Sequence, residues 1–272
     1  MKDNIGITYT NALTLYKNFV RKLMHEERFF NEHPLLTKME EGFSSYTGFV
    51  EEGCILYRAR IVDVKIRNNY LRENGFRGFN KEHSFVPPQK SAKENRASPA
   101  GIVYLYVAEN EHTAIAEVRP SMLDEISVAR IKVLQRLKIL DLSFNFPVEI
   151  LLPHKGSHTL TILAKEYMVP LDIKDNNGGY LPTQLITEFI RKHEFGFDGI
   201  RYNSSLDLGG KNLVIFNYKK CEPVESDIYK VNLIEYCALG QTGNKHIIEG
   251  KRLQDSRRDA GYAAAGKLII DE

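Results

Sequence analysis

Apolar residues near the N-terminus recur at alternating steps of four and three. Within residues 8–31 they fall at Tyr9, Leu13, Tyr16, Val20 and Leu23. This spacing puts all of them on one face of a helix and is typical of an amphipathic helix. We therefore predict a helix in this segment that packs its apolar stripe against the main body of the protein.

Further along the chain, apolar runs of strand length alternate with turn-forming residues. The predicted strands span 54–64, 102–108, 126–133, 137–142, 197–205 and 211–218. Two longer segments, 157–168 and 182–195, have helical patterns, and Pro182 suits the first position of the second helix. Because these strands and helices interleave without strict alternation, the predicted fold class is α+β.

Two segments lack this periodicity. Residues 67–100 are rich in Asn, Gly, Pro and charged residues and are predicted to form a long loop, and loops of that length tend to be functional or disordered. The polar, Gly- and Ala-rich tail from about Gly240 is predicted to be a peripheral helix or a mobile end. The expected division is an N-terminal helical extension (1–50), a main domain (51–225) and a C-terminal segment packed on it or partly mobile (226–272).

Charge and cysteine content narrow the class of protein. The 37 Lys and Arg residues nearly balance the 35 Asp and Glu residues, so we expect no direct nucleic-acid binding, and any bound anion should meet a few placed cations. Three widely separated cysteines suggest neither a disulfide framework nor a zinc site. The N-terminus has no apolar signal-like region, and no run has the length of a membrane span. We expect a cytoplasmic protein without membrane contact.

The familiar catalytic motifs are absent from the sequence. It contains no P-loop, no dinucleotide-binding glycine motif after a strand, no zinc-protease motif and no nucleophile-elbow motif. His154 and His158 are four residues apart, but Pro153 and Gly156 argue against one helical face, so both are interpreted as surface polar residues. The sequence therefore predicts neither a nucleophilic triad nor a bound metal.

The remaining chemistry-bearing residues lie around the middle of the chain. Arg58 falls on a predicted strand with Arg60 on the same face, Arg96 in the long loop, Tyr106 on the next strand and Glu117 near a short helix end closed by a proline. Taken singly, they read as a structural salt bridge, a core aromatic and a solvated carboxylate. None of these residues taken singly therefore indicates a binding site.

Taken together, these side chains are complementary to NAD⁺. Guanidinium forks suit a pyrophosphate, and an aromatic face suits the cationic nicotinamide ring. A carboxylate stabilises the positive charge that develops on the ribose when the N-glycosidic bond breaks. Because nicotinamide leaves as a neutral molecule, the reaction needs no strong general acid.

Three sequence blocks match a known pattern. They are LYRAR (56–60), NRASPAGIVYLYVAENEHTAIAEV (95–118) and FDGIRYNSSLDLGGKNLVIF (197–216). With these blocks in this order, the sequence resembles the RES-domain family over roughly residues 50–225. The resemblance implies a toxin of a bacterial toxin–antitoxin pair that destroys NAD⁺, on a mixed sheet similar to that of ADP-ribosyltransferases. It also implies an antitoxin partner carrying an Xre-like helix-turn-helix.

The resemblance assigns roles by motif position. Arg58 and Arg96 correspond to the two family arginines, Tyr106 to the stacking aromatic, and Glu117 and Ser204 to the catalytic glutamate and serine. Ser205 is the alternative to Ser204 and points to the opposite face of an extended chain. The resemblance thus implies that Arg58, Glu117 and Ser204 are catalytic and that all five residues bind the substrate.

This chain departs from the family pattern in three respects. About fifty residues precede the domain, the spacing between Arg58 and Arg96 is long, and Asn203 stands where the family usually has proline. These departures bear on the partner arrangement more than on the chemistry. The long loop itself is open to interpretation as a lid, an antitoxin contact or neither.

The leading hypothesis is an enzyme that cleaves NAD⁺ between nicotinamide and ribose, by phosphorolysis or hydrolysis. NAD⁺ would be the substrate, inorganic phosphate a possible co-substrate, and no cofactor is required. Two alternatives stay open: ADP-ribosyl transfer to a macromolecule, and a non-catalytic nucleotide-binding module. The sequence does not choose among phosphate, water and a protein side chain as acceptor.

Overall fold

The structure is a computed structural model that describes residues 9–28, 32–63, 76–144, 157–168 and 179–234. The chain divides into two compact units, Met1–Asn232 and Leu233–Glu272. All the helices and strands given below belong to the first unit. The predictions for the chain's other segments, including the tail from Gly240, concern residues outside the described ones.

The first unit combines one mixed sheet with several helices, which confirms the predicted α+β class. Its helices are α1 Tyr9–His25, α2 Pro34–Glu40, α4 Lys81–Ser84, α5 Glu111–Glu117, α6 His158–Met168 and α7 Leu181–Lys192, with 3-10 turns η1 Gln89–Ser91 and η4 Tyr218–Lys220. Its strands are β1 Thr47–Val50, β2 Ile55–Ile61, β3 Leu105–Ala108, β4 Glu125–Val133, β5 Leu137–Asp141, β6 Gly199–Asn203, β7 Lys211–Ile215 and β8 Cys221–Lys230.

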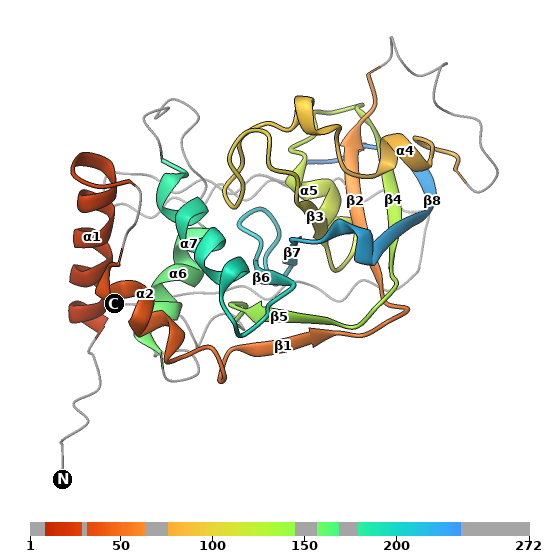
Figure 1. The fold of residues 1–272 in the computed structure, drawn as a ribbon. Coiled ribbons are helices and arrows are strands. Elements are labelled where there is room, and N and C mark those ends of the chain that lie inside the picture. The colour runs from red at the N-terminus through yellow and green to blue at the C-terminus, as the bar shows by residue number, and fades with distance from the viewer. Residues whose placement is uncertain (1–8, 29–31, 64–75, 145–156, 169–178, 235–272) are drawn as a thin grey trace, which may run out of the picture. The chain divides into compact units, whose positions relative to one another are not determined.

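The eight strands form a single sheet in the order β1-β5-β6-β7-β3-β2-β4-β8. The β5–β6 pair is parallel, and the other neighbouring pairs are antiparallel. A parallel pair needs a crossover connection, and here α6 and α7 lie in it. Figure 1 shows α1, α2, α6 and α7 gathered near β5 and β6, and α5 over β2 and β3.

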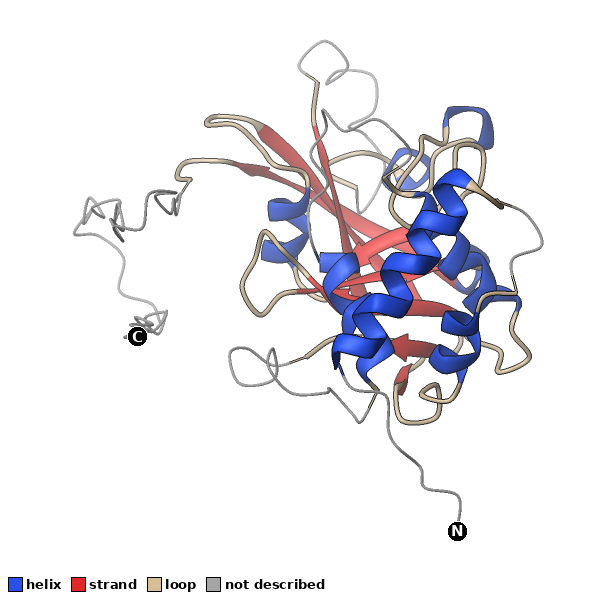
Figure 2. Ribbon diagram, turned by 90° about the vertical axis from the view of Figure 1, so that its left-hand side faces the viewer, coloured by secondary structure: helices blue, strands red, loops and turns tan. Residues whose placement is uncertain are grey.

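Two apolar clusters hold this arrangement together. The first joins the helices to the sheet and includes the fully buried residues Phe19, Leu23, Tyr167 and Ile200. The second is built from strand residues such as Leu105, Ile131, Leu137 and Leu213. Figure 2 shows the helices in front of the strands, which fits a core between a helical layer and the sheet. Burying a large apolar side chain stabilises a fold by about 1.5–3 kcal/mol.

Helix α1 confirms the N-terminal amphipathic helix but ends at His25. Its buried residues are Ala12, Tyr16, Phe19 and Leu23. Of the predicted stripe, Tyr16 and Leu23 are buried, while Tyr9 is 38% exposed. The buried face is therefore rotated toward Ala12 and Phe19, because the small alanine lets α1 approach its neighbours closely.

The predicted strands all appear in the sheet, most of them with shorter bounds, and the helices predicted at 157–168, 182–195 and before Pro120 are also present. The missed elements include α2, β1 and β8. Helix α2 begins with Pro34, and the His33 ring nitrogen Nδ1 accepts a hydrogen bond from the Leu35 amide at 3.1 Å. Strand β1 has only four residues, and β8 contains Pro223, which an edge strand tolerates.

The sheet also bears on the expected domain boundaries, which stay a prediction. Strand β1 lies within the first fifty residues and pairs with β5, while β8 crosses the expected boundary at 225. The described part of the predicted loop, from Phe76 to Ala100, contains only the short α4 and η1. A bridge between Phe76 and Ser226 ties its start to β8.

Strands β2 and β3 are joined more loosely than their neighbours. They share one registered pair, Tyr57 with Ala108, whereas β2 and β4 share seven and β3 and β7 share four. Beyond that pair, the side chain of Arg58 reaches across, and its Nη1 donates a hydrogen bond to the Tyr106 carbonyl at 2.8 Å. A guanidinium therefore takes the place of a backbone ladder at this point in the sheet.

Asn203 gives the first testable prediction. It is buried, its Oδ1 accepts from the Phe144 amide at 2.8 Å, and its Nδ2 donates to the Phe144 carbonyl at 2.9 Å. The change Asn203→Ala removes both of these buried hydrogen bonds, so the free energy of unfolding should fall by about 2 kcal/mol. Urea denaturation measures this loss. Ser205 is exposed and provides the control. The change Ser205→Ala should alter the free energy of unfolding by less than about 0.5 kcal/mol.

Candidate active site

Arg58 is a half-buried cation that pairs with no carboxylate of the described residues. Burial chiefly lowers the pKa of its guanidinium to about 9, the nearby charge of Arg60 lowers it further, and the effect of Tyr106 opposes both. The Nε atom is buried without a hydrogen-bond partner, and within the described residues no carboxylate forms an ion pair with Arg58. Such a group is costly in the free protein and is suited to receiving an anion. The structural salt bridge that the sequence suggests for Arg58 taken singly is not found among the described residues.

Glu117 is the last residue of α5, and two buried side chains hold its carboxylate. Its Oε1 accepts hydrogen bonds from Ser204 Oγ at 2.6 Å and from Asn212 Nδ2 at 2.7 Å. The glutamate side chain itself is exposed, so one carboxylate oxygen is anchored while the side chain borders open space. The result is an oriented carboxylate rather than a freely moving one.

Ser204 is the serine that contacts the candidate site, and its hydroxyl is fully engaged. Besides donating to Glu117, its Oγ accepts from the amides of Leu206 and Asp207 at 3.0 and 3.1 Å. Ser205 is exposed. The sequence left the choice between the two serines open, and Ser204 is the one adjacent to Glu117, where it orients the carboxylate. A contact from Ser204 to substrate stays a prediction.

The loop after Ser204 is tied to α5 at a second point. The Thr113 hydroxyl donates to the Asp207 carboxylate, and Asn110 caps the helix by accepting from the Thr113 amide at 2.7 Å. A Cβ at Gly210 would displace the hydrogen-bonded ends of Asp207 and Thr113, so a glycine at this position allows that contact. These contacts fix the end of α5, and therefore Glu117, against β6 and β7.

Two tyrosines add flat apolar surface beside these charges. The Tyr106 hydroxyl is 2.9 Å from Ser98 Oγ, and burial chiefly raises its pKa to about 12. Tyr202 packs on Tyr167 with ring centroids 5.3 Å apart, and burial is the main cause that raises its pKa as well. Both phenols therefore stay protonated near neutral pH and offer uncharged rings to a ligand.

These side chains line one cleft of about 230 Å³. Its wall includes Arg58, Tyr106, Glu117, Tyr202 and Asn212. The structure thus brings three of the predicted residues to one cleft and connects Ser204 to it through Glu117. A cation, a carboxylate and two aromatic rings face the same small volume.

Arg96 is the one predicted arginine that does not line the described cleft. Its carbonyl accepts from Thr183 Oγ1 at 2.7 Å, and it is not among the described residues that line the cleft. Its charge nevertheless acts on this region, because it helps to lower the pKa values of Tyr106 and Tyr202 against the stronger effect of burial. It also acts on Glu166, whose pKa is raised chiefly by burial. The described cleft therefore has Arg58 in its wall without Arg96, although the sequence predicted that both hold one pyrophosphate.

Tyr202 and Asn212 were missed by the sequence reasoning. They pair in register across β6 and β7, so their side chains share a face of the sheet. Tyr202 is also two residues before Ser204, which is the spacing of one strand face. The signal was thus present as strand periodicity, and a polar Asn212 inside an otherwise apolar run marked the partner strand.

Other chemistry is sparse in the part of the chain that the structure describes. No group of three or more His, Cys, Asp or Glu residues there could hold a metal ion. Cys54 is exposed, Cys221 is buried with a pKa raised to about 12 chiefly by burial, and Cys237 lies outside the described residues, as does His154. None of the described helices has the length and apolarity of a membrane span.

A comparison with known families identifies the family of this chain. The family model of the RES domain matches residues 59–233, well over half of the chain. This chain belongs to the RES domain family. The match starts directly after Arg58 and contains Arg96, Tyr106, Glu117 and Ser204. RES domains are known in toxin–antitoxin systems.

No curated protein and no solved structure matches the chain. The likeness of the RES-domain sheet to ADP-ribosyltransferases therefore stays a prediction of the sequence resemblance. The mixed sheet itself is observed in the structure.

The guanidinium of Arg58, which pairs with no carboxylate of the described residues, leads to a second prediction. Replacing Arg58 by Met removes an unpaired charge, which favours the ligand-free protein, and also the hydrogen bond to the Tyr106 carbonyl, which opposes this gain, so the free energy of unfolding without ligand should change by less than about 1 kcal/mol. The same change should abolish stabilisation by inorganic pyrophosphate, which at a hundredfold excess over its Kd would give the wild type about 2.7 kcal/mol. Thermal unfolding with and without pyrophosphate measures both effects.

The control for this prediction is Arg136→Met. Arg136 pairs with the exposed Glu51 on the protein surface, so this variant should keep the full response to pyrophosphate. An Arg58→Met protein that responds to pyrophosphate as wild type does would contradict the anion site.

Proposed function

We propose that this RES-domain protein cleaves NAD⁺ at the bond between nicotinamide and ribose. The observation that supports this most is the anchored carboxylate of Glu117, which borders the same cleft as the guanidinium of Arg58. A fixed negative charge and a half-buried positive charge in the wall of one small cleft suit a substrate with a cationic glycoside and an anionic linker. NAD⁺ has both.

The chemistry follows from the position of each charge. The nicotinamide ring would lie against Tyr106 and Tyr202, and its glycosidic carbon would lie near Glu117. When the bond breaks, its electron pair goes to the nicotinamide nitrogen, which becomes neutral, and positive charge develops on the ribose carbon. The Glu117 carboxylate stabilises that charge, and Ser204 and Asn212 keep it oriented without reorganisation.

Arg58 would hold the pyrophosphate of the same substrate. Its Nη1 already donates to the Tyr106 carbonyl, while its Nε has no partner in the described protein. Paired hydrogen bonds from a guanidinium to phosphate oxygens are strong and directional. Substrate binding would thus supply the anion that this cation lacks.

The acceptor of the ADP-ribosyl group would then add to the ribose carbon. Inorganic phosphate would give ADP-ribose 1″-phosphate, water would give ADP-ribose, and a side chain of a macromolecule would become ADP-ribosylated. We favour phosphate or water, because the described cleft is small.

In a cell, this activity would make the protein a toxin that depletes cytoplasmic NAD⁺. A small antitoxin with an Xre-like helix-turn-helix would neutralise it. Support for this part of the proposal comes from membership of a family that occurs in toxin–antitoxin systems.

The role of Glu117 is tested by its amide. Glu117→Gln keeps the shape of the side chain but removes the negative charge, so the rate of NAD⁺ loss should fall on the order of a hundredfold or more. The purified variant is assayed for nicotinamide release. Glu111→Gln changes a carboxylate at the start of the same helix, away from the cleft, and should retain near wild-type activity.

Equal activity of Glu117→Gln and wild type would overturn the assigned role. A wild-type protein that binds NAD⁺ without consuming it would instead favour the non-catalytic nucleotide-binding module.

The acceptor is identified by the products. Incubation with NAD⁺ and inorganic phosphate should yield nicotinamide together with ADP-ribose 1″-phosphate, and omission of phosphate should slow the reaction or divert it to ADP-ribose. Mass spectrometry of the small molecules and of the protein separates these results. Labelled macromolecule without free ADP-ribose products would contradict the favoured acceptors and support the transferase alternative.

A further inference from the structure

The cleft that contains Glu117 is too small for a whole dinucleotide. Its volume is about 230 Å³. Pockets for drug-sized ligands occupy roughly 300–1,000 Å³, and NAD⁺ is at the upper end of that size class. If the proposed function is correct, the cleft can hold the nicotinamide riboside end, and the rest of the substrate must extend beyond Arg58.

Two further hollows continue from this cleft. A cavity of about 140 Å³ shares Arg58 and Tyr106 with it. A larger cavity of about 790 Å³ shares Pro87, Ile102 and Val103 with the 140 Å³ cavity. Each hollow therefore shares wall residues with the next, and Arg58 belongs to the walls of the first and the second.

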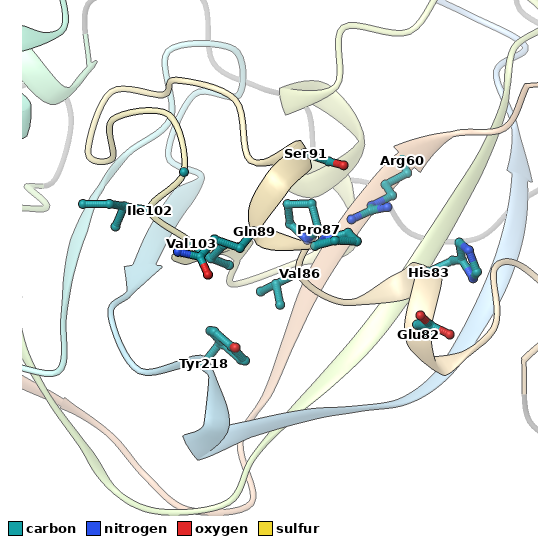
Figure 3. A pocket seen from close by; sticks show the side chains of 12 residues that line it. Arg60, Glu82, His83, Val86, Pro87, Gln89, Ser91, Ile102, Val103 and Tyr218 are labelled. Carbon is teal, nitrogen blue, oxygen red and sulfur yellow. The ribbon is translucent and has the colours of Figure 1, made fainter.

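The 790 Å³ cavity has walls that suit an adenosine. Val86, Pro87 and Val103 are apolar, and Tyr218 presents a ring that is held edge-on by Phe85, with centroids 5.8 Å apart and an interplanar angle of 82°. Figure 3 shows Val86 between Tyr218 and the segment with Pro87. A purine could lie between the apolar wall and this ring.

Polar groups in the same wall could meet the purine edge, the ribose and the phosphate. Gln89 and Ser91 are exposed side chains at the rim, and both line the cavity. Arg60 donates one hydrogen bond, from Nη2 to the Phe85 carbonyl at 2.7 Å, which leaves other N–H groups of the guanidinium for a ligand. In Figure 3 the Arg60 side chain reaches from β2 toward Pro87.

The order of the groups along β2 agrees with the order of the groups in the substrate. Arg58 and Arg60 lie on the same strand face, and strand residues two apart are separated by about 6.6 Å. Arg58 borders the cleft with Glu117, and Arg60 borders the 790 Å³ cavity. A ligand that runs from Glu117 past Arg58 would therefore reach Arg60 and Tyr218 next.

We propose that the 790 Å³ cavity between β2, the 82–103 segment and Tyr218 is the adenosine subsite, occupied by the AMP half of the dinucleotide. This inference rests on the proposed cleavage of NAD⁺ for the identity of the ligand. It assigns to the long loop a direct part in substrate binding, since most of the cavity wall comes from residues of that loop.

The first test measures binding without catalysis. The chain contains no tryptophan, so Tyr218→Trp introduces a single fluorescent reporter in the cavity wall. AMP should quench this fluorescence in a saturable manner, and nicotinamide mononucleotide, which lacks the adenosine, should not. Phe49→Trp places the reporter on β1, where Phe49 is 44% exposed, and should show no response to AMP.

The second test separates the two halves of the substrate kinetically. Ser91→Trp fills the cavity from its rim, whereas Lys90→Trp alters an exposed neighbour that does not line it. Ser91→Trp should raise the KM for NAD⁺ by about tenfold, the loss expected when one stacked base is displaced. Its kinetics with nicotinamide mononucleotide should be unchanged, and Lys90→Trp should match wild type for both substrates.

The outcomes distinguish the subsite from the cleavage reaction. Quenching by AMP in a protein that consumes neither NAD⁺ nor nicotinamide mononucleotide would support the subsite and overturn the cleavage proposal. Consumption of NAD⁺ with unchanged KM in Ser91→Trp, and no AMP response of Tyr218→Trp, would overturn the subsite and leave the cleavage intact.

Discussion

The site depends on a guanidinium held inside the sheet without a neutralising carboxylate. Arg58 bridges β2 and β3 where their backbone pairing is reduced to one registered residue pair. A neighbouring acid would make this arrangement more stable, yet the residue whose charge affects Arg58 most is Arg60, another cation. Two positive charges on one strand face raise the free energy of the unliganded protein and lower that of a complex with a polyanion. This imbalance is the physical reason to regard the region as a binding site.

The opposite charge is fixed by a different set of constraints. Glu117 ends a helix of only seven residues, which has little intrinsic stability and depends on its surroundings. A cap from Asn110, the Thr113–Asp207 hydrogen bond and the two donors on the carboxylate hold that helix to β6 and β7. The carboxylate is thereby positioned by strands that are distant in sequence from α5. Oriented charges of this kind stabilise a developing cation without a cost of reorganisation.

The sequence could predict most of the fold and about half of the site for identifiable reasons. Apolar periodicity is local, so it located the buried strands and the long helices, but it could not find β1, with four residues, or β8, in which polar residues and a proline interrupt the pattern. Motif spacing located Arg58, Tyr106 and Glu117. Asn212 became visible only through cross-strand register, and the displacement of Arg96 from the cleft depends on how α6 and α7 pack, which no local pattern records.

Helix α1, near the N-terminus, packs into the same apolar cluster as those helices. Tyr16 and Phe19 of α1 belong to the same apolar cluster as Tyr104, Tyr167 and Ile200, so α1 completes the core beside the site. A hydrogen bond from Tyr16 reaches Glu166 on α6, and the charge of Arg96 acts on that same carboxylate. The charge of Arg96 thus acts on an acid that α1 helps to hold, whereas no carboxylate of the described residues pairs with Arg58. The two family arginines differ in this respect: a helix that precedes the matched RES domain contributes to the surroundings of one, and the other is left for the ligand.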